Sequence, residues 1–270
     1  MISEKLAQKV RKHVVEMTSR GNSSHVGSAL SITDLLAVLY GKILCFDPGN
    51  PKWEKRDRFL LSKGHAGAAV YAILAEVGFF STEILQTHYQ NGSILSGHVS
   101  HKDVPGVEFS TGSLGHALSV GVGMAYNAKL KGENHRVFVL MSDGECGEGS
   151  NWEAILFASH HCLDNLVVII DYNKIQSMGR VEDILKLEPF AEKLLAFGWE
   201  TVEIDGHNHE EIYVACDNIP KTAKKPTCII ANTVKGKGVS FMENTVLWHY
   251  RSPQKEDFIN AIQELEVAIL

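Results

Sequence analysis

Residues 141–152 read MSDGECGEGSNW and directly follow the apolar run RVFVL at 136–140. Three glycines and three carboxylates lie within this stretch. The run before it is typical of a buried strand, and the residues after the glycines are typical of a helix start. Ligands of α/β proteins bind at such junctions, beyond the carboxyl ends of parallel strands. The stretch therefore predicts an α/β fold with a ligand site at this loop.

Apolar strands alternate with helices along the rest of the chain. Strands are expected at 59–62, 136–141, 166–171, 199–204 and 227–233. Helices are expected at 2–20, 31–43, 63–78, 117–132 and 257–270, with a Gly/Ser-rich turn at 20–28 and a Gly/His/Ser-rich loop at 91–115. Strands that are apolar throughout and alternate with helices indicate a parallel sheet covered on both faces. We predict a single α/β domain over 1–270, with a doubly wound, mainly parallel sheet and helices on both faces.

Two helix boundaries carry specific signals. Ser31 or Thr33 is expected to cap the helix in SITDLLAVLYGKI, because a hydroxyl accepts hydrogen bonds from the free amides of a first turn. Gly78 is expected to end the helix at 63–78, because glycine readily adopts the left-handed conformation found after helices.

Bulk composition excludes several classes of protein. The net charge is -6, and the densest basic group is KTAKK at 221–225, which argues against nucleic acid as a partner. The five cysteines form no CxxC pair, which predicts reduced thiols in the cytoplasm. No apolar run is expected to reach the roughly 18 residues of a membrane span. We therefore expect a soluble cytoplasmic protein that does not enter a membrane.

The acidic loop itself predicts a metal. Asp143 follows one expected strand and Asn173 follows the next, with 28 residues between the Asp-Gly pair and Asn173. If the two strands are neighbours, these side chains converge. A carboxylate, an amide oxygen and a backbone carbonyl form a hard oxygen site for Mg²⁺ or Ca²⁺, whose remaining ligands are water and phosphate oxygens. A metal thus reconciles the acidic loop with a diphosphate, which the helix amides at Ser150 and Asn151 can face.

Two other interpretations of the loop are possible. A dinucleotide fingerprint has the order GxGxxG, whereas GECGEG has the order GxxGxG, and its carboxylates would face a pyrophosphate without a metal. An ordinary turn with surface carboxylates is the other alternative, and it leaves the position of Asn173 without explanation.

The loop resembles the thiamine diphosphate signature, a Gly-Asp-Gly followed about thirty residues later by Asn; here Ser142 replaces the first glycine. Further motifs occur in the order SSHVGSALSITDLL, RDRFLLSKGHAGAAVYA, LSGHVSH, TGSLGHALSVGVGMA and SDGECGEGSNWEA. Together they resemble the N-terminal half of a transketolase over nearly the whole chain. The resemblance implies thiamine diphosphate and Mg²⁺ (or Ca²⁺) as cofactors.

The same resemblance implies roles for individual residues. The histidines that ring the thiazolium and handle sugar hydroxyls correspond to His25, His65, His98 and His249. Imidazole transfers protons near neutral pH, which the reaction requires. Cofactor-binding positions correspond to His65, Gly112, Leu114, Asp143, Gly144, Glu145, Glu148, Asn173 and Ile175. Among these, the metal ligands correspond to Asp143, Asn173 and Ile175.

Four positions within or near these motifs differ from the family pattern or have a separate role in the family. Ser113 stands where transketolases often have proline, and His116 where many have glutamine, so His116 is expected in or near the substrate site. Glu148 matches an acidic residue at the subunit interface. Tyr250 follows His249 where the family usually has glycine, so this loop is expected to run differently and to narrow the donor pocket.

The resemblance also implies a partner. The catalytic glutamate of the family belongs to a pyrimidine-binding domain, and we expect this domain and the C-terminal domain on a partner chain. We therefore expect a separate C-terminal transketolase subunit, in an assembly with two of each chain, and a sugar or sugar phosphate as substrate. The alternatives are a subunit of a 2-oxoacid dehydrogenase or deoxyxylulose phosphate synthase type of enzyme, a noncatalytic regulatory subunit, and a hydride-transferring dehydrogenase that binds NADH.

Overall fold

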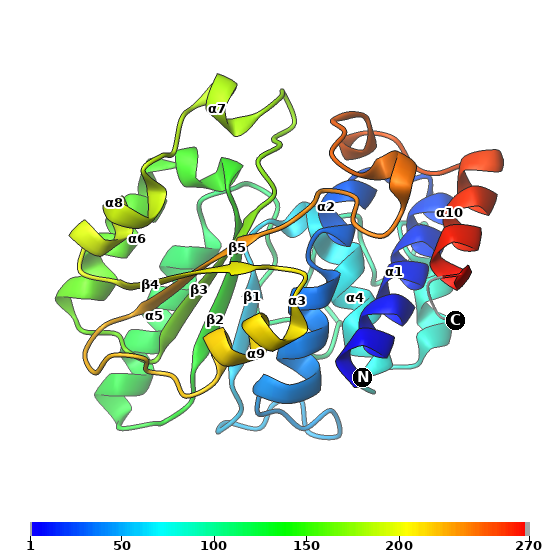
Figure 1. The fold of residues 1–270 in the computed structure, drawn as a ribbon. Helices are drawn as coiled ribbons and strands as arrows, with labels where there is room; N and C mark the ends of the chain where they lie inside the picture. The colour runs from blue at the N-terminus through cyan, green and yellow to red at the C-terminus, as the bar shows by residue number, and fades with distance from the viewer. Residues whose placement is uncertain (1, 268–270) are drawn as a thin grey trace.

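The protein is described here by a computed structural model, which covers residues 2–267 (Figure 1). Its five strands form one fully parallel sheet in the order β1-β2-β3-β5-β4. The strands are β1 (Arg58–Leu61), β2 (Val137–Ser142), β3 (Leu166–Tyr172), β4 (Glu200–Asp205) and β5 (Thr227–Asn232). All five predicted strands are confirmed, and their ends differ from the expected positions by no more than one residue. The predicted α/β class is confirmed as well.

Helices cover both faces of the sheet (Figure 1). One layer contains α1 (Ile2–Gly21), α2 (Val26–Leu30), α3 (Thr33–Val38), α4 (Gly67–Glu76), α9 (His209–Cys216) and α10 (Glu256–Val267). The other contains α5 (Ala117–Lys131), α6 (Gly149–His160) and α8 (Phe190–Ala196), while the short α7 (Val181–Ile184) lies in the segment after β3. Because successive strand residues point to opposite faces, Phe138 and Leu140 pack in the first core, and Val137, Val139 and Met141 in the second.

The segment before α3 differs from the prediction. The expected turn contains a short helix, α2, and neither Ser31 nor Thr33 caps α3, whose N-cap residue is Ile32. The two hydroxyls have other acceptors: Ser31 Oγ donates to Asp171 Oδ2 at 2.7 Å, and Thr33 Oγ1 donates to Leu30 O at 3.0 Å. The capping prediction is therefore wrong, because a buried carboxylate from β3 competes for the serine.

The C-terminal ends of the helices agree better with the predicted ranges. Gly78 follows α4 with φ +93° and Gly132 follows α5 with φ +69°, both in the left-handed region that favours glycine. The predicted loop at 91–115 contains no helix or strand in the described structure. The C-terminal helix is present as α10, and the part of its expected range at 268–270 lies outside the described residues.

One apolar segment is longer than expected. The 18 residues from Val26 to Ile43 have a mean hydropathy of 1.4, so the prediction that no run reaches this length is wrong. The structure divides the segment between α2, α3 and the turn that follows, and buries 83% of it inside the molecule. This is the packing of core helices, and most apolar residues of this segment lie in the first core.

A fully buried ion pair joins the layers at the carboxyl edge of the sheet. Lys63 follows β1, Asp171 is in β3, and both side chains are 0% exposed. The Asp171 carboxylate also accepts hydrogen bonds from Ser31, Asn173 and Thr233. Burial by itself would raise the pKa of Asp171, but the charge of Lys63 and these hydrogen bonds lower it. The carboxylate is therefore charged and fully partnered.

We expect Lys63→Met to destabilise the fold strongly, because Asp171 would keep a buried charge without its cation. Removing one partner of a buried pair typically costs about 3–5 kcal/mol. Urea unfolding of the full chain measures the loss, and a second variant, Lys63→Met with Asp171→Asn, should recover part of it. Equal free energies of unfolding for the wild type and Lys63→Met would contradict this account.

Candidate active site

The loops after β2 and β3 meet at one point, as predicted from the positions of Asp143 and Asn173. The two strands are direct neighbours, with Ser142 opposite Asp171. Asp143 Oδ2 accepts a hydrogen bond from the Lys174 amide at 2.6 Å, so the loop after β2 is tied to the residue that follows Asn173. Asp143 Oδ1 accepts from the amide of the next residue at 2.6 Å. The neighbouring strands thus produce the expected convergence.

The Asp143 carboxylate is well suited to hold a cation. It is 2% exposed, and burial together with the charge of Asp171 raises its pKa to about 6. Two backbone amides and the more distant Lys63 only partly oppose this effect. A buried carboxylate in such surroundings gains stability from a bound cation, because the cation offsets the cost of burying the charge.

Neutral oxygens complete the candidate metal site. Asn173 Oδ1 accepts from the Ile175 amide at 3.1 Å, and the Ile175 carbonyl accepts from Lys235 Nζ at 2.9 Å. A carbonyl or amide oxygen has a second lone pair for a metal. Residues 2–267 hold no group of three or more His, Cys, Asp or Glu side chains that could bind a metal. One carboxylate with neutral oxygens fits Mg²⁺, which takes its other ligands from water and phosphate.

Glu145 supports a neighbouring loop. Its side chain is fully buried and accepts hydrogen bonds from the Gly115 amide at 2.8 Å and from the Ser62 hydroxyl. It therefore lies behind the 111–115 loop, which contains the predicted cofactor residues Gly112 and Leu114. Gly144, in the same turn, lies close to the Gln176 side chain. A Cβ on this glycine would be 3.0 Å from Gln176 Cγ.

The 111–115 loop packs against the histidine motifs. A Cβ on Gly64 would lie 2.2 Å from the Thr111 carbonyl oxygen, so only glycine permits this contact. A Cβ on Gly112 would lie 3.5 Å from His98 Cδ2, which places this glycine beside the predicted proton-transfer residues. His116 is exposed at the start of α5, and its Nδ1 lies 3.0 Å from the Leu114 carbonyl oxygen.

The four predicted histidines gather into one cluster although they come from four segments. The ring of His25 lies 5.1 Å from that of His65, 5.6 Å from His98 and 4.8 Å from His249, measured between centroids. His25 has φ +74°, a left-handed conformation unusual for histidine, and its amide donates to the His249 carbonyl at 3.0 Å. The left-handed backbone thus directs the His25 ring toward the centre of the cluster.

All four histidines are held in the neutral form at neutral pH. Burial is the largest cause in each case, and it lowers the pKa of His25 to about 4 and that of His249 to about 3. The pKa of His65 is well below its usual value, and the pKa of His98 is lowered too. Neutral imidazoles accept as well as donate hydrogen bonds, which suits the handling of hydroxyl groups.

Two buried lysines also belong to the site, although the motifs in the sequence did not predict them as site residues. Lys63 Nζ donates to Ser28 Oγ at 2.9 Å, and the same hydroxyl forms a hydrogen bond of 2.9 Å with His65 Nε2. Lys235 Nζ lies 3.0 Å from His249 Nδ1, which must be the acceptor because an ammonium only donates. Burial lowers the pKa of Lys235 to about 8. Their only sequence signal is a lysine beside glycine, in SKG and VKG, at the ends of buried strands.

Tyr250 adopts an ordinary backbone conformation, with φ −109°, so the loop at this point does not need glycine. Its ring lies 5.1 Å from that of His249, and its hydroxyl donates to the Ser177 carbonyl at 3.0 Å. The tyrosine thereby links the segment after β5 to the segment after β3. Glu148 is exposed at the start of α6, and its side chain does not cap this helix.

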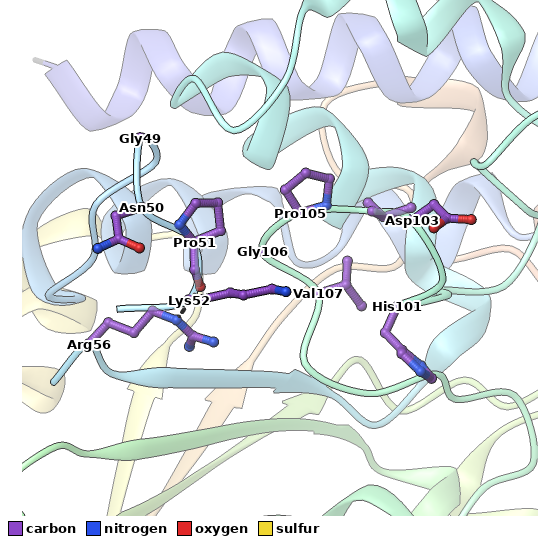
Figure 2. Close-up of a pocket in the computed structure, with 11 residues that line it drawn as sticks. Gly49, Asn50, Pro51, Lys52, Arg56, His101, Asp103, Pro105, Gly106 and Val107 are labelled. Atoms are coloured by element: carbon purple, nitrogen blue, oxygen red, sulfur yellow. Dashed lines mark hydrogen bonds between the residues drawn. The ribbon is translucent and has the colours of Figure 1, made fainter. Parts of the chain in front are cut away.

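A pocket of about 590 Å³ lies elsewhere, and none of the predicted site residues lines it. Figure 2 shows Lys52, Arg56, His101 and Asp103 around it. The Arg56 guanidinium already pairs with the Glu108 carboxylate, with one contact of 3.0 Å. The histidine cluster, rather than this pocket, therefore combines the groups needed for chemistry.

Comparison with known proteins identifies the family of the chain. Residues 2–265 match the family model described as transketolase, thiamine diphosphate binding domain. The chain is 44% identical to an apulose-4-phosphate transketolase subunit of Phocaeicola vulgatus, over 97% of this chain and 93% of that protein. It is 41% identical to the 6-deoxy-6-sulfo-D-fructose transketolase subunit SqwG of Clostridium sp., over 96% and 94% of the two chains.

Solved structures show the same fold. The transketolase of Leishmania mexicana superposes with a TM-score of 0.92 at 30% identity, and the match covers 98% of this chain. The chain spans 41% of the length of that transketolase. With the family model, the relatives and the fold in agreement, the chain belongs to the transketolase family, within its thiamine diphosphate binding domain.

Proposed function

We propose that this chain is the N-terminal subunit of a two-chain transketolase. The enzyme transfers a two-carbon ketol unit from a ketose to an aldose and is active only with a C-terminal partner subunit. The observation that carries the proposal is the cluster of four neutral histidines, which Lys235 connects to the Ile175 carbonyl of the candidate metal site. This arrangement combines proton-transfer groups with a place for a metal and an anion.

The lengths of the relatives support a two-chain enzyme. The relatives named as subunits match this chain over 93% and 94% of their own length, whereas the match covers 41% of the Leishmania mexicana transketolase. We therefore place the pyrimidine-binding and C-terminal domains on the partner, in an assembly with two of each chain. We place this assembly in the cytoplasm, with Glu148 at the interface between subunits.

The residues present fit thiamine diphosphate with Mg²⁺ or Ca²⁺. Asp143, Asn173 and the Ile175 carbonyl would hold the metal, and the loop at Gly112 and Leu114 would contact the pyrimidine ring. When bound, the cofactor would supply a nucleophilic carbanion and an electron sink for the negative charge of the transferred two-carbon unit. The protein supplies binding, orientation and proton transfer.

The histidines are placed to handle substrate hydroxyls. His25 Nδ1 is buried, and no atom of residues 2–267 forms a hydrogen bond with it. An unpaired buried nitrogen costs stability unless a ligand satisfies it. We assign His25 to a sugar hydroxyl, with His65, His98 and His249 around the same space. Lys63, through Ser28, fixes the orientation of His65.

The substrate is a sugar or a sugar phosphate. Two relatives act, by their names, on apulose-4-phosphate and on 6-deoxy-6-sulfo-D-fructose. Tyr250 lies beside His249 and closes one side of the cluster. We propose that this tyrosine narrows the donor pocket and influences which ketose enters.

Native mass spectrometry of the tagged full chain, purified from its own cells with Mg²⁺, tests the function. We expect a mixed assembly that carries thiamine diphosphate and identifies the partner by mass. The Asp143→Asn chain should assemble with the same partner but lack the cofactor, because the neutral amide removes the charge that holds the metal.

Glu153→Gln, which removes an exposed acidic side chain from α6, is the control for the loss of one negative charge, and it should retain the cofactor. Normal cofactor content in Asp143→Asn would exclude the metal assignment. Assembly of the wild-type chain without a partner and without thiamine diphosphate would support a noncatalytic role.

His25→Asn should lower kcat of the assembled enzyme by about 100-fold, the usual effect of losing a proton-transfer group. Asparagine tolerates the left-handed backbone at this position. Steady-state kinetics and calorimetric titration with thiamine diphosphate measure turnover and cofactor affinity. His101→Asn, in an exposed loop, is the control, and full turnover in His25→Asn would assign His25 a structural role only.

The neutral histidines also predict a pH dependence of stability. An unfolded histidine has a pKa near 6.5, whereas the pKa of folded His25 is about 4. Between these values the unfolded chain binds more protons than the folded chain, so the free energy of unfolding falls as the pH decreases through this window. Urea unfolding at several pH values should show a smaller loss in His25→Asn. Identical slopes for the two chains would argue against a depressed pKa.

A further inference from the structure

A second polar cluster lies behind the active site, around Asp34 in the first turn of α3. This carboxylate is 4% exposed and accepts hydrogen bonds from Arg11 of α1, from His207 after β4, and from His209 at the start of α9. None of these residues is among the groups assigned to cofactor or substrate. The cluster links three separate segments of the chain: α1, α3 and the segment at 207–209, which runs from the end of β4 to the start of α9.

Of the two histidines, His207 continues toward the active site. Its Nδ1 lies 2.8 Å from Asp34 Oδ2, and its Nε2 lies 2.8 Å from the amide nitrogen of Val234. Because an amide only donates, Nε2 must be the acceptor, and Nδ1 therefore carries the proton that is donated to Asp34. The two contacts fix both the tautomer and the orientation of the ring.

The amide that His207 holds is adjacent to a residue of the site. Val234 precedes Lys235, whose ammonium contacts the Ile175 carbonyl at 2.9 Å and His249 Nδ1 at 3.0 Å. Two further backbone bonds hold the same turn: the Gly236 amide donates to the Gly27 carbonyl at 2.9 Å, and the Lys235 carbonyl accepts from the Asn244 amide at 2.9 Å. Lys235 is 1% exposed, so its direction depends on how this turn is anchored.

We propose that His207 is a positioning residue, which uses Asp34 as its anchor and holds the Val234 amide so that Lys235 points between Ile175 and His249. The part of the inference that concerns the cofactor rests on the proposed function, since Ile175 and His249 are placed there in the cofactor and substrate site. The contact between Lys235 and His249 does not depend on it.

His209 provides a matched control. Its side chain and that of His207 are both 12% exposed, and both contact the same carboxylate. His209 Nε2 lies 3.0 Å from Asp34 Oδ1, but its Nδ1 lies 2.9 Å from Ser3 Oγ, on α1. Loss of either histidine removes one bond to Asp34, and only loss of His207 releases the turn with Lys235.

The experiment compares His207→Phe, His207→Gln and His209→Phe in the full chain. The first measurement is the side-chain ¹⁵N spectrum of His249, which reports the hydrogen bond from Lys235 to its Nδ1. The second is calorimetric titration with thiamine diphosphate in the presence of Mg²⁺. Thermal unfolding of each variant measures the general loss of stability.

We expect His207→Phe to move the His249 nitrogen signals and to weaken thiamine diphosphate binding about tenfold, a factor that corresponds to about 1.4 kcal/mol. His207→Gln should recover most of both effects, because its side-chain oxygen can accept from the Val234 amide. His209→Phe should leave the His249 signals and the affinity unchanged.

Equal effects of His207→Phe and His209→Phe would overturn the proposal, since they would indicate general destabilisation. Unmoved His249 signals in a folded His207→Phe chain would overturn it as well. If the wild type assembled with its partner fails to bind thiamine diphosphate, the proposed function fails, while the His249 spectrum still decides the role of His207.

Discussion

The structure of the site depends on the buried ion pair between Lys63 and Asp171. The lysine follows β1 and the aspartate is in β3, and β2 lies between these strands. Two charges without exposure to water are stable only if each is paired and hydrogen-bonded. Asp171 meets this condition through side chains from the segment before α3 and from the segments after β3 and β5. One carboxylate thus fixes the relative positions of the loops that form the site.

This arrangement also sets the electrostatics of the histidines. Lys63 and Lys235 both lie close enough to lower the pKa of His65 and His249, in addition to the larger effect of burial. Cations beside imidazoles disfavour imidazolium and therefore keep the rings available as proton acceptors. The same lysines favour an anionic ligand, so neutral histidines and diphosphate binding have a common cause. Asp143, whose pKa is raised, supplies the negative charge that a metal would neutralise.

The outer cluster at Asp34 shows how the helical layer takes part in the site. His207 joins α3 to the turn after β5, and this turn carries Lys235. Two hydrogen bonds therefore connect a core helix to the backbone amide of the residue before Lys235. Rigid support of this kind lets a buried lysine keep one direction, since a flexible side chain would otherwise lose orientation.

The sequence by itself determined the strands, the helix layers and the chemical types of the site residues. Apolar runs of strand length identify the five strands, and a glycine signal identifies the end of α4, because these features depend on local physical chemistry. The convergence of Asp143 and Asn173 follows once strands are parallel neighbours. The order of the motifs identified the four histidines, and the tertiary structure brings them together in one cluster.

Only the tertiary structure decided which polar side chains are buried and paired. The sequence alone predicts that Lys63 and Lys235 are ordinary surface residues. Lysine is rarely buried without a partner, and the partners of these two lysines are distant in the chain. Ser31 fits a helix cap locally, but Asp171 of β3 takes its hydroxyl. The roles of Glu145 under its loop and of His207 behind Lys235 likewise depend on contacts across the fold. Such pairing depends on long-range geometry, which no local pattern of residues records.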